Sequence, residues 1–144
     1  MNPRDFYILA LKLSKSNQPV ECRTAINRAY YAAYHVGIEI LEDLECGIKI
    51  SKNAGGHGEV IKFLSNSGDK LTENAATQLN GLLSNRIKSD YRLDYSGVEN
   101  KETADANVKV ALGIIEILED WSNDDAKRNQ IAKALIEYQE RIRA

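Results

Sequence analysis

The segment "CRTAINRAYYAAYHVGIEILEDL", from Cys22 to Leu44, carries one apolar seam at helical spacing, and the architecture of the chain follows from it. Steps of four and three residues alternate from Cys22 to Ile40, and a further step of four reaches Leu44. The seam consists of Cys22, Ile26, Ala29, Ala33, Val36, Ile40 and Leu44. Small residues in its middle allow a neighbouring helix to approach closely, and Pro19 suits a first helical turn. The pattern therefore predicts a long central helix from near Pro19 to about Leu44.

The rest of the chain shows further helical patterns and no alternation typical of strands. Helices are predicted after Asn2 and Pro3, over 58–67, from near Thr72 to about Tyr91, from Thr103 to Trp121 and over 123–144, with Ser122 or Asn123 capping the last. Their inward residues are expected to include Val60, Phe63, Leu64, Leu71, Ala75, Leu79, Leu82, Leu83, Ile87, Val108, Ala111, Ile115, Leu118, Ile131, Leu135, Tyr138 and Ile142. Short connections predict an all-α, up-and-down helical bundle of five or six helices in a single domain, 1–144.

Composition and charge exclude several classes of function but do not identify one. The chain has 144 residues and a net charge of −2, so binding of nucleic acid would need a local basic patch. Cys22 and Cys46 form no disulfide framework or zinc spacing, and no apolar run or leader indicates a membrane or export. No phosphate-binding glycine fingerprint is present. We expect a cytoplasmic protein with reduced thiols, no metal and no cofactor.

The central helix carries two polar faces besides its seam. Arg23, Asn27, Tyr30 and Tyr34 share one face, while Arg28 and His35 share another with Tyr31 at its edge. On one interpretation the tyrosines cover the core and keep their hydroxyls in water. On the other, Arg23, Asn27 and Tyr30 form a polar surface against another helix or subunit.

A second group of polar residues lies in "NRIKSDYRLDY", Asn85 to Tyr95. Arg86 and Asp90 are four residues apart, so they can form an intrahelical ion pair. The functional alternative is an anion-binding arginine held by a carboxylate, with Lys88 and Arg92 adding positive charge for a phosphate. His57, in "GGHGEV", reads as an exposed loop histidine beside a helix start, and a catalytic role would need a partner close in space.

Three stretches in order resemble the HEPN family of small all-α domains. "RTAINRAYYAAYHVGIEIL" is similar to a family helix with the pattern Ala-x-x-Arg-Ala-Tyr-Tyr-Ala-x-x-His, and "LLSNRIKSDYRLDY" is similar to an Arg-x-x-Ala-Asp-Tyr segment in which Ser89 replaces alanine. Between them, "HGEVIKFL" resembles a His-led helix of the same branch. The resemblance covers roughly 4–120 and leaves out the last helix, 123–144.

This resemblance implies a homodimer from a prokaryotic toxin–antitoxin or defence system. Many HEPN domains are metal-independent RNases, while others are non-catalytic modules that bind RNA, a nucleotide or a nucleotidyltransferase, and a nucleotidyltransferase antitoxin would be the implied partner here. Arg86 matches the arginine that active members carry, followed by four to six residues and then a histidine. Asp90 and Tyr91 stand where that histidine would be.

The missing histidine directs attention to the two that the chain has. Cleavage by the 2′-hydroxyl of RNA needs a group that takes a proton and a cation that stabilises the phosphorane. Arg86 can supply the cation, and Asp90 and Tyr91 complete the candidate catalytic segment. We expect Asn27 and Tyr30 to contact this segment. Without the histidine, the segment suits binding, or a mechanism that borrows His35 or His57.

Overall fold

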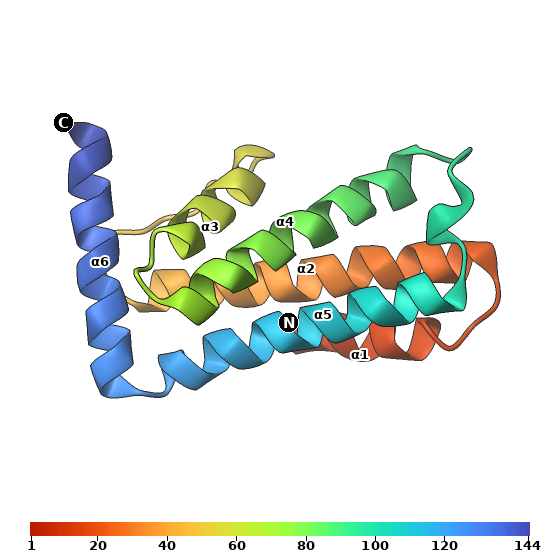
Figure 1. The fold of residues 1–144 in the computed structure, drawn as a ribbon, viewed down its shortest axis with the longest axis horizontal. Coiled ribbons are helices and arrows are strands. Elements are labelled where there is room, and N and C mark those ends of the chain that lie inside the picture. The colour runs from red at the N-terminus through yellow and green to blue at the C-terminus, as the bar shows by residue number, and fades with distance from the viewer.

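The chain folds into six α-helices without a strand, as the sequence predicts, and the computed structural model describes residues 1–144 (Figure 1). The helices are α1 (Arg4–Leu13), α2 (Pro19–Asp43), α3 (Gly55–Ser65), α4 (Lys70–Tyr91), α5 (Lys101–Ser122) and α6 (Asp125–Arg143), with a short 3-10 turn, η1 (Ser96–Val98), before α5. None of these helices combines the length and apolar character needed to span a bilayer.

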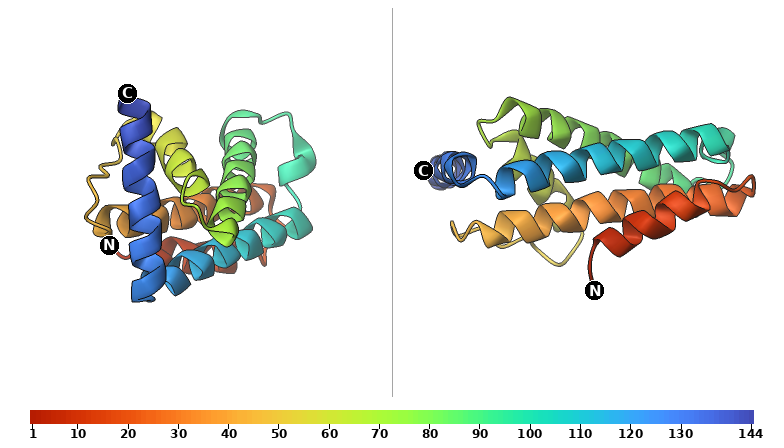
Figure 2. Two further views of the ribbon diagram at one scale, coloured as in Figure 1. Left: turned by 60° about the vertical axis from the view of Figure 1, so that its left-hand side comes forward. Right: turned by 90° about the horizontal axis from the view of Figure 1, so that it is seen from below.

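Helix α2 lies at the centre of the bundle and contacts α1, α4 and α5 along its length. Every residue of its predicted seam is buried, from Cys22 to Leu44. Figure 2 shows α1 and α5 running beside α2, and Figure 1 shows α4 leaning across it. The alanines of the seam, Ala29 and Ala33, are fully buried, which agrees with the close approach that small residues allow.

Helix α3 begins earlier than the sequence predicts, at Gly55 instead of near Gly58, and it packs mainly against α4. The turn between the two helices places Gly68 at a φ of 73°, a left-handed conformation that glycine adopts without steric cost. Asp69 then caps α4 by accepting a hydrogen bond from the Thr72 backbone N–H at 3.1 Å. Because α3 begins at Gly55, His57 lies in its first turn, and the prediction of His57 as a loop residue is wrong.

Helix α6 does not extend the up-and-down arrangement but crosses one end of the bundle (Figure 1), and Figure 2 shows it end-on beside α2 and α5. Ile131, Leu135 and Gln139 form its buried face, and the Gln139 side chain donates to the Cys46 carbonyl at 3.0 Å. Its N-cap is Asp124, whose carboxylate accepts from the Lys127 N–H, so the prediction of Ser122 or Asn123 as the cap is wrong.

Three predicted inward residues are exposed: Leu71 by 55%, Ile87 by 40% and Ile142 by 61%. Leu71 lies in the first turn of α4, where Thr72 is the residue that faces inward. Near Ile87, the side of α4 that faces α2 buries Ser89 instead. Ile142 lies in the last turn of α6, beyond the three residues of that helix that the bundle end buries.

Candidate functional site

Arg86 provides a positive charge that neighbouring side chains hold in place, while part of its guanidinium remains free to bind a ligand. Its side chain is only 15% exposed, and its guanidinium lies 5.3 Å from the ring centroid of Tyr31 and 5.7 Å from that of Tyr91. The buried Nε lies 3.0 Å from Asp90 Oδ2, in an ion pair without the alignment of a hydrogen bond. Both terminal amino groups make no hydrogen bond to the protein and remain accessible, so they can hold a phosphate.

Asp90 is connected to α2 through a short polar chain. The Asn27 side-chain amide donates to Asp90 Oδ2 at 2.7 Å, and Arg28 Nε donates to Asn27 Oδ1 at 2.6 Å. The expected contact between Asn27 and the Arg86–Asp90 segment is thereby confirmed. One carboxylate oxygen of Asp90 thus receives both Asn27 and Arg86, an arrangement that fixes where the guanidinium lies.

Tyr30 contacts α3 through its hydroxyl, which lies 2.6 Å from Nδ1 of His57. Its side chain is fully buried, so the interpretation that its hydroxyl stays in water is wrong. The sequence predicted a contact of Tyr30 with the Arg86–Asp90 segment of α4, but the only hydrogen bond of its hydroxyl is this one to α3. Burial raises the pKa of Tyr30 far above its ordinary value, so the hydroxyl remains protonated.

Both histidines gather around the same two tyrosine rings. The ring centroid of Tyr34 lies 5.2 Å from that of His35 and 4.6 Å from that of His57, and Tyr31 lies 5.9 and 6.0 Å from them. Burial, and then the charge of Arg28, lowers the pKa of His35. Burial lowers the pKa of His57 too, followed by the charges of Arg86 and His35. Each imidazole is therefore neutral near pH 7 and able to accept or donate one proton.

Beside these rings lies a cleft of about 500 Å³ between α2 and the segment that precedes α3. Tyr31, Tyr34 and His35 line one side, His57 lies at its α3 end, and Ile50 to Ala54 line the other side. The size falls within the range of small-molecule sites. A larger, strongly polar cleft lies elsewhere, between α1, α2, α5 and α6, and contains neither histidine.

Gly56 explains how α3 approaches this cleft so closely. A Cβ at this position would lie 2.3 Å from the Ser51 carbonyl oxygen and 2.5 Å from the Tyr34 hydroxyl. Any side chain would therefore push α3, and His57 with it, away from α2. The repeated glycine of "AGGHG" is the only sequence signal of this close packing.

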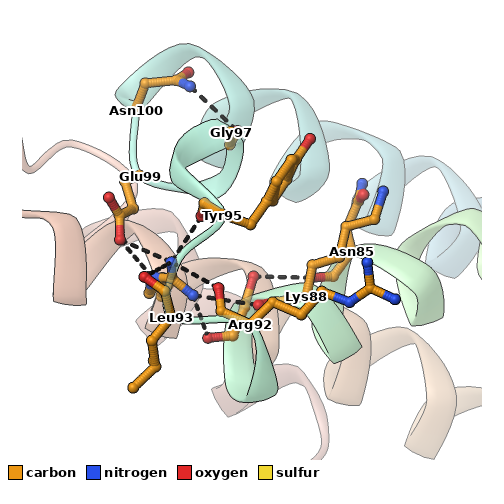
Figure 3. A network of polar contacts seen from close by, with 10 residues as sticks. Asn85, Lys88, Arg92, Leu93, Tyr95, Gly97, Glu99 and Asn100 are labelled. Carbon is orange, nitrogen blue, oxygen red and sulfur yellow. Dashed lines mark hydrogen bonds and ion pairs between the residues drawn. The ribbon is translucent and has the colours of Figure 1, made fainter.

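Arg23 lies on the same face of α2 as Asn27 and Tyr30, but its guanidinium binds backbone carbonyl groups. Its guanidinium donates to the carbonyls of Lys88, Ser89, Arg92, Leu93 and Tyr95, and it pairs with the Glu99 carboxylate at 2.8 Å. We call these contacts the Arg23 network; Figure 3 shows how the acceptor segment folds back from α4 through Tyr95 to Glu99. All five N–H donors are directed to the protein, which leaves Arg23 no role in binding a ligand directly.

The candidate residues therefore separate into groups. Arg86, Asp90 and Asn27 form one connected polar unit, and Arg28 joins it while lying 4.9 Å from the ring of Phe6. Tyr30, His35 and His57 form a second group around Tyr31 and Tyr34, two residues whose central position the sequence did not reveal. Tyr91 is 71% exposed and touches the site only through its ring against Arg86.

Comparison with known proteins adds no relative from which a role could be transferred. No protein-family profile, no curated protein and no solved structure matches the chain.

Proposed function

We propose that this protein is a HEPN-like protein of a prokaryotic toxin–antitoxin or defence system and that it cuts RNA without a metal ion. One observation carries the proposal. Arg86, with two free amino groups, lies against Tyr31, and the same ring is a neighbour of both histidines of the chain. A cation that anchors the phosphate and a neutral imidazole that takes a proton are the groups that transesterification of RNA requires.

In the proposed reaction Arg86 holds the scissile phosphate through its free amino groups. His35 makes no hydrogen bond in the protein, so either ring nitrogen can take the proton of the ribose 2′-hydroxyl. The 2′-oxygen then attacks phosphorus, the bond to the 5′-oxygen breaks, and that oxygen takes a proton from water. The products are a 2′,3′-cyclic phosphate and a 5′-hydroxyl end.

His57 has a different role because Tyr30 occupies its Nδ1. The phenol proton directed at Nδ1 leaves the imidazole proton on Nε2, where it can donate to a phosphoryl oxygen. Arg86 and His57 would then share the negative charge that develops on the phosphorane. Asp90 orients Arg86 in this scheme.

A non-catalytic module that binds RNA, a nucleotide or a nucleotidyltransferase partner is the second candidate. The exposed ring of Tyr91 beside the Arg86 guanidinium favours it, since an aromatic ring next to a cation offers a stacking platform for a base. Leu93, 78% exposed, and Ile87 extend this surface with apolar side chains. We propose that a homodimer forms here and brings two Arg86–Tyr91 segments together.

Expression in a bacterial host, with RNA integrity followed over time, tests the catalytic proposal. We expect the native chain to arrest growth and fragment RNA, and Arg86→Ala to abolish both effects. Arg86→Lys keeps the charge but loses the planar fork, so it should weaken both. Arg143→Ala is the matched control, because Arg143 is exposed in the last turn of α6 and belongs to neither group of candidate residues.

The other variants assign the roles. His35→Ala should abolish cleavage while leaving the phosphate contact of Arg86, and His57→Ala should slow cleavage. Asp90→Asn should retain much of the activity if Asp90 only orients Arg86. Full RNA fragmentation by Arg86→Ala at matched protein levels would refute the site. Binding without fragmentation in the native chain would favour the non-catalytic module. Sedimentation tests the dimer, and a monomer at tens of micromolar (~10⁻⁵ M,) would contradict it.

A further inference from the structure

Apart from His35 and His57, the residues that line the cleft beside the histidines have no role in the proposed cleavage reaction, although the cleft is directly connected to the phosphate site. Tyr31 provides the connection: its ring lines the cleft and also lies 5.3 Å from the Arg86 guanidinium. A phosphate held by Arg86 and a group bound in the cleft would therefore be separated by about one side chain. A nucleotide joins its phosphate and its base over a similar span.

The walls of the cleft suit a flat, partly apolar ligand. Tyr31, Tyr34 and His35 line the α2 side, and Ile38 and Ile50 add aliphatic surface. Aromatic rings bind unstacked nucleobases by stacking, whatever the base, whereas bases within a duplex are not available to such a site. The side chains of the cleft therefore suit a base of single-stranded nucleic acid better than a base within a duplex.

Glu42 supplies the polar group that can distinguish bases. Its Oε2 accepts the Ile50 backbone N–H at 2.9 Å, while Oε1 makes no hydrogen bond in the protein. Glu42 lines this cleft and also borders the larger polar cleft between α1, α2, α5 and α6. A carboxylate in a cleft accepts hydrogen bonds and donates none. An exocyclic amino group, such as the N4 amine of cytosine, matches it. Uracil has a carbonyl oxygen at the same place and would meet the carboxylate unfavourably.

We infer that this cleft binds an unstacked nucleobase with an exocyclic amino group, next to the RNA phosphate held by Arg86. The inference rests on the proposed function, because it takes the Arg86 site to be the place where the phosphate binds. It adds the substrate class, single-stranded RNA, and names Glu42 as the residue that determines base preference. Glu42 contacts the base and not the reacting atoms, so it is a specificity residue.

Calorimetric titration of the full chain with three probes tests the inference: cytidine 3′-monophosphate, uridine 3′-monophosphate and ribose 5-phosphate, which lacks a base. Stacking should make the cytidine nucleotide bind about tenfold tighter than ribose phosphate. The uridine nucleotide should bind several-fold more weakly than the cytidine nucleotide. Glu42→Gln, whose amide can donate a hydrogen bond, should remove or reverse this preference.

Filling the cleft provides a second, independent variant. Ala54 is exposed and lines the cleft, so Ala54→Trp should block the base while leaving the ribose phosphate affinity unchanged. Ser65→Trp places the same side chain at the far end of α3, where the residue is exposed and outside the cleft, and should change nothing.

The outcomes separate the two proposals. Equal affinities for ribose phosphate and both nucleotides, all lost in Arg86→Ala, would overturn the base cleft and leave the phosphate site standing. Cytidine nucleotide binding that is blocked by Ala54→Trp but unchanged by Arg86→Ala would support the base cleft and refute the phosphate site. Equal cytidine and uridine affinities would remove the role of Glu42, and binding of no probe would overturn both proposals.

Discussion

The Tyr30 hydroxyl lies 2.6 Å from Nδ1 of His57 and joins the middle of α2 to the first turn of α3. Tyr30 is fully buried and its hydroxyl has no other polar partner, so we expect the hydroxyl to donate to the imidazole. The two residues are 27 positions apart in the sequence, and both helices must be in place before they meet.

This contact predicts the tautomer of His57. The neutral imidazole should carry its proton on Nε2, because Nδ1 accepts the phenol proton. Long-range ¹H–¹⁵N NMR spectra at neutral pH distinguish the two nitrogens. Tyr30→Phe removes the donor and should produce a mixture of tautomers, whereas His35 should be unaffected. A native His57 with its proton on Nδ1 would contradict the prediction.

Stability should fall as the pH falls from neutrality, because both histidines have a lowered pKa in the folded chain. On unfolding each pKa returns to its ordinary value of 6.5, so below that pH the unfolded chain binds more protons. Their contribution is therefore complete above about pH 6.5 and is lost as the pH drops toward the folded values. Urea unfolding between about pH 7.5 and about pH 5, roughly one unit above and one and a half units below the ordinary value, measures this.

The double variant His35→Gln and His57→Gln is the control for this pH dependence. It should flatten the decline in the free energy of unfolding over the same range. Asp69 and Asp105, whose pKa values are lowered from 3.8, lose their contributions only in more acidic solution, so the two windows do not overlap. An unchanged slope in the double variant would show that other groups cause the decline.

Asn27→Leu should reduce the free energy of unfolding by about 1–3 kcal/mol, because it removes hydrogen bonds to two charged partners, Asp90 and Arg28. The Arg86 guanidinium should then be less well oriented, so RNA binding should weaken while helicity remains. A double-mutant cycle with Asp90→Ala, followed by urea unfolding, isolates the contact between them. Additive losses would mean that the two side chains do not interact.

Two glycines of α3 should respond in opposite ways to the same substitution. Gly56→Ala forces a Cβ against Ser51 and Tyr34, so it should cost about 1–3 kcal/mol, as overpacking generally does. Gly58→Ala meets nothing within 4 Å and should stabilise the helix by up to about 1 kcal/mol. Thermal and urea unfolding of both variants test this, and equal effects would contradict the close approach of α3 to α2.

The sequence predicted those parts of the fold that depend on local periodicity. The seam of α2 is buried throughout, and Val108, Ala111, Ile115 and Leu118 of α5 are buried as expected. Periodicity alone could not show that α6 crosses the bundle end, because crossing depends on the surface that the other helices leave uncovered. For this reason Ile142 repeats the pattern of Ile131 and Leu135 but remains exposed.

The same limit applies to the candidate site. The ion pair between Arg86 and Asp90 follows from their spacing of four, which helix geometry fixes locally. The meeting of Tyr30 with His57 depends on how closely α3 packs, and that is decided by the missing side chain of Gly56. No pattern within one helix contains this information.

The Arg23 network has a consequence for the order in which the molecule assembles. Its acceptors lie 65 to 76 residues further along the chain, so the contacts cannot form until α2 and α4 are docked. We expect the network to form after the rate-limiting barrier of folding. Contacts of that kind slow unfolding without speeding folding. Stopped-flow measurements on Arg23→Met should therefore show faster unfolding and a nearly unchanged folding rate, with Arg92→Met as the silent control. In that case Arg23 contributes to kinetic stability, because it lowers the unfolding rate and so sets how long the folded site persists.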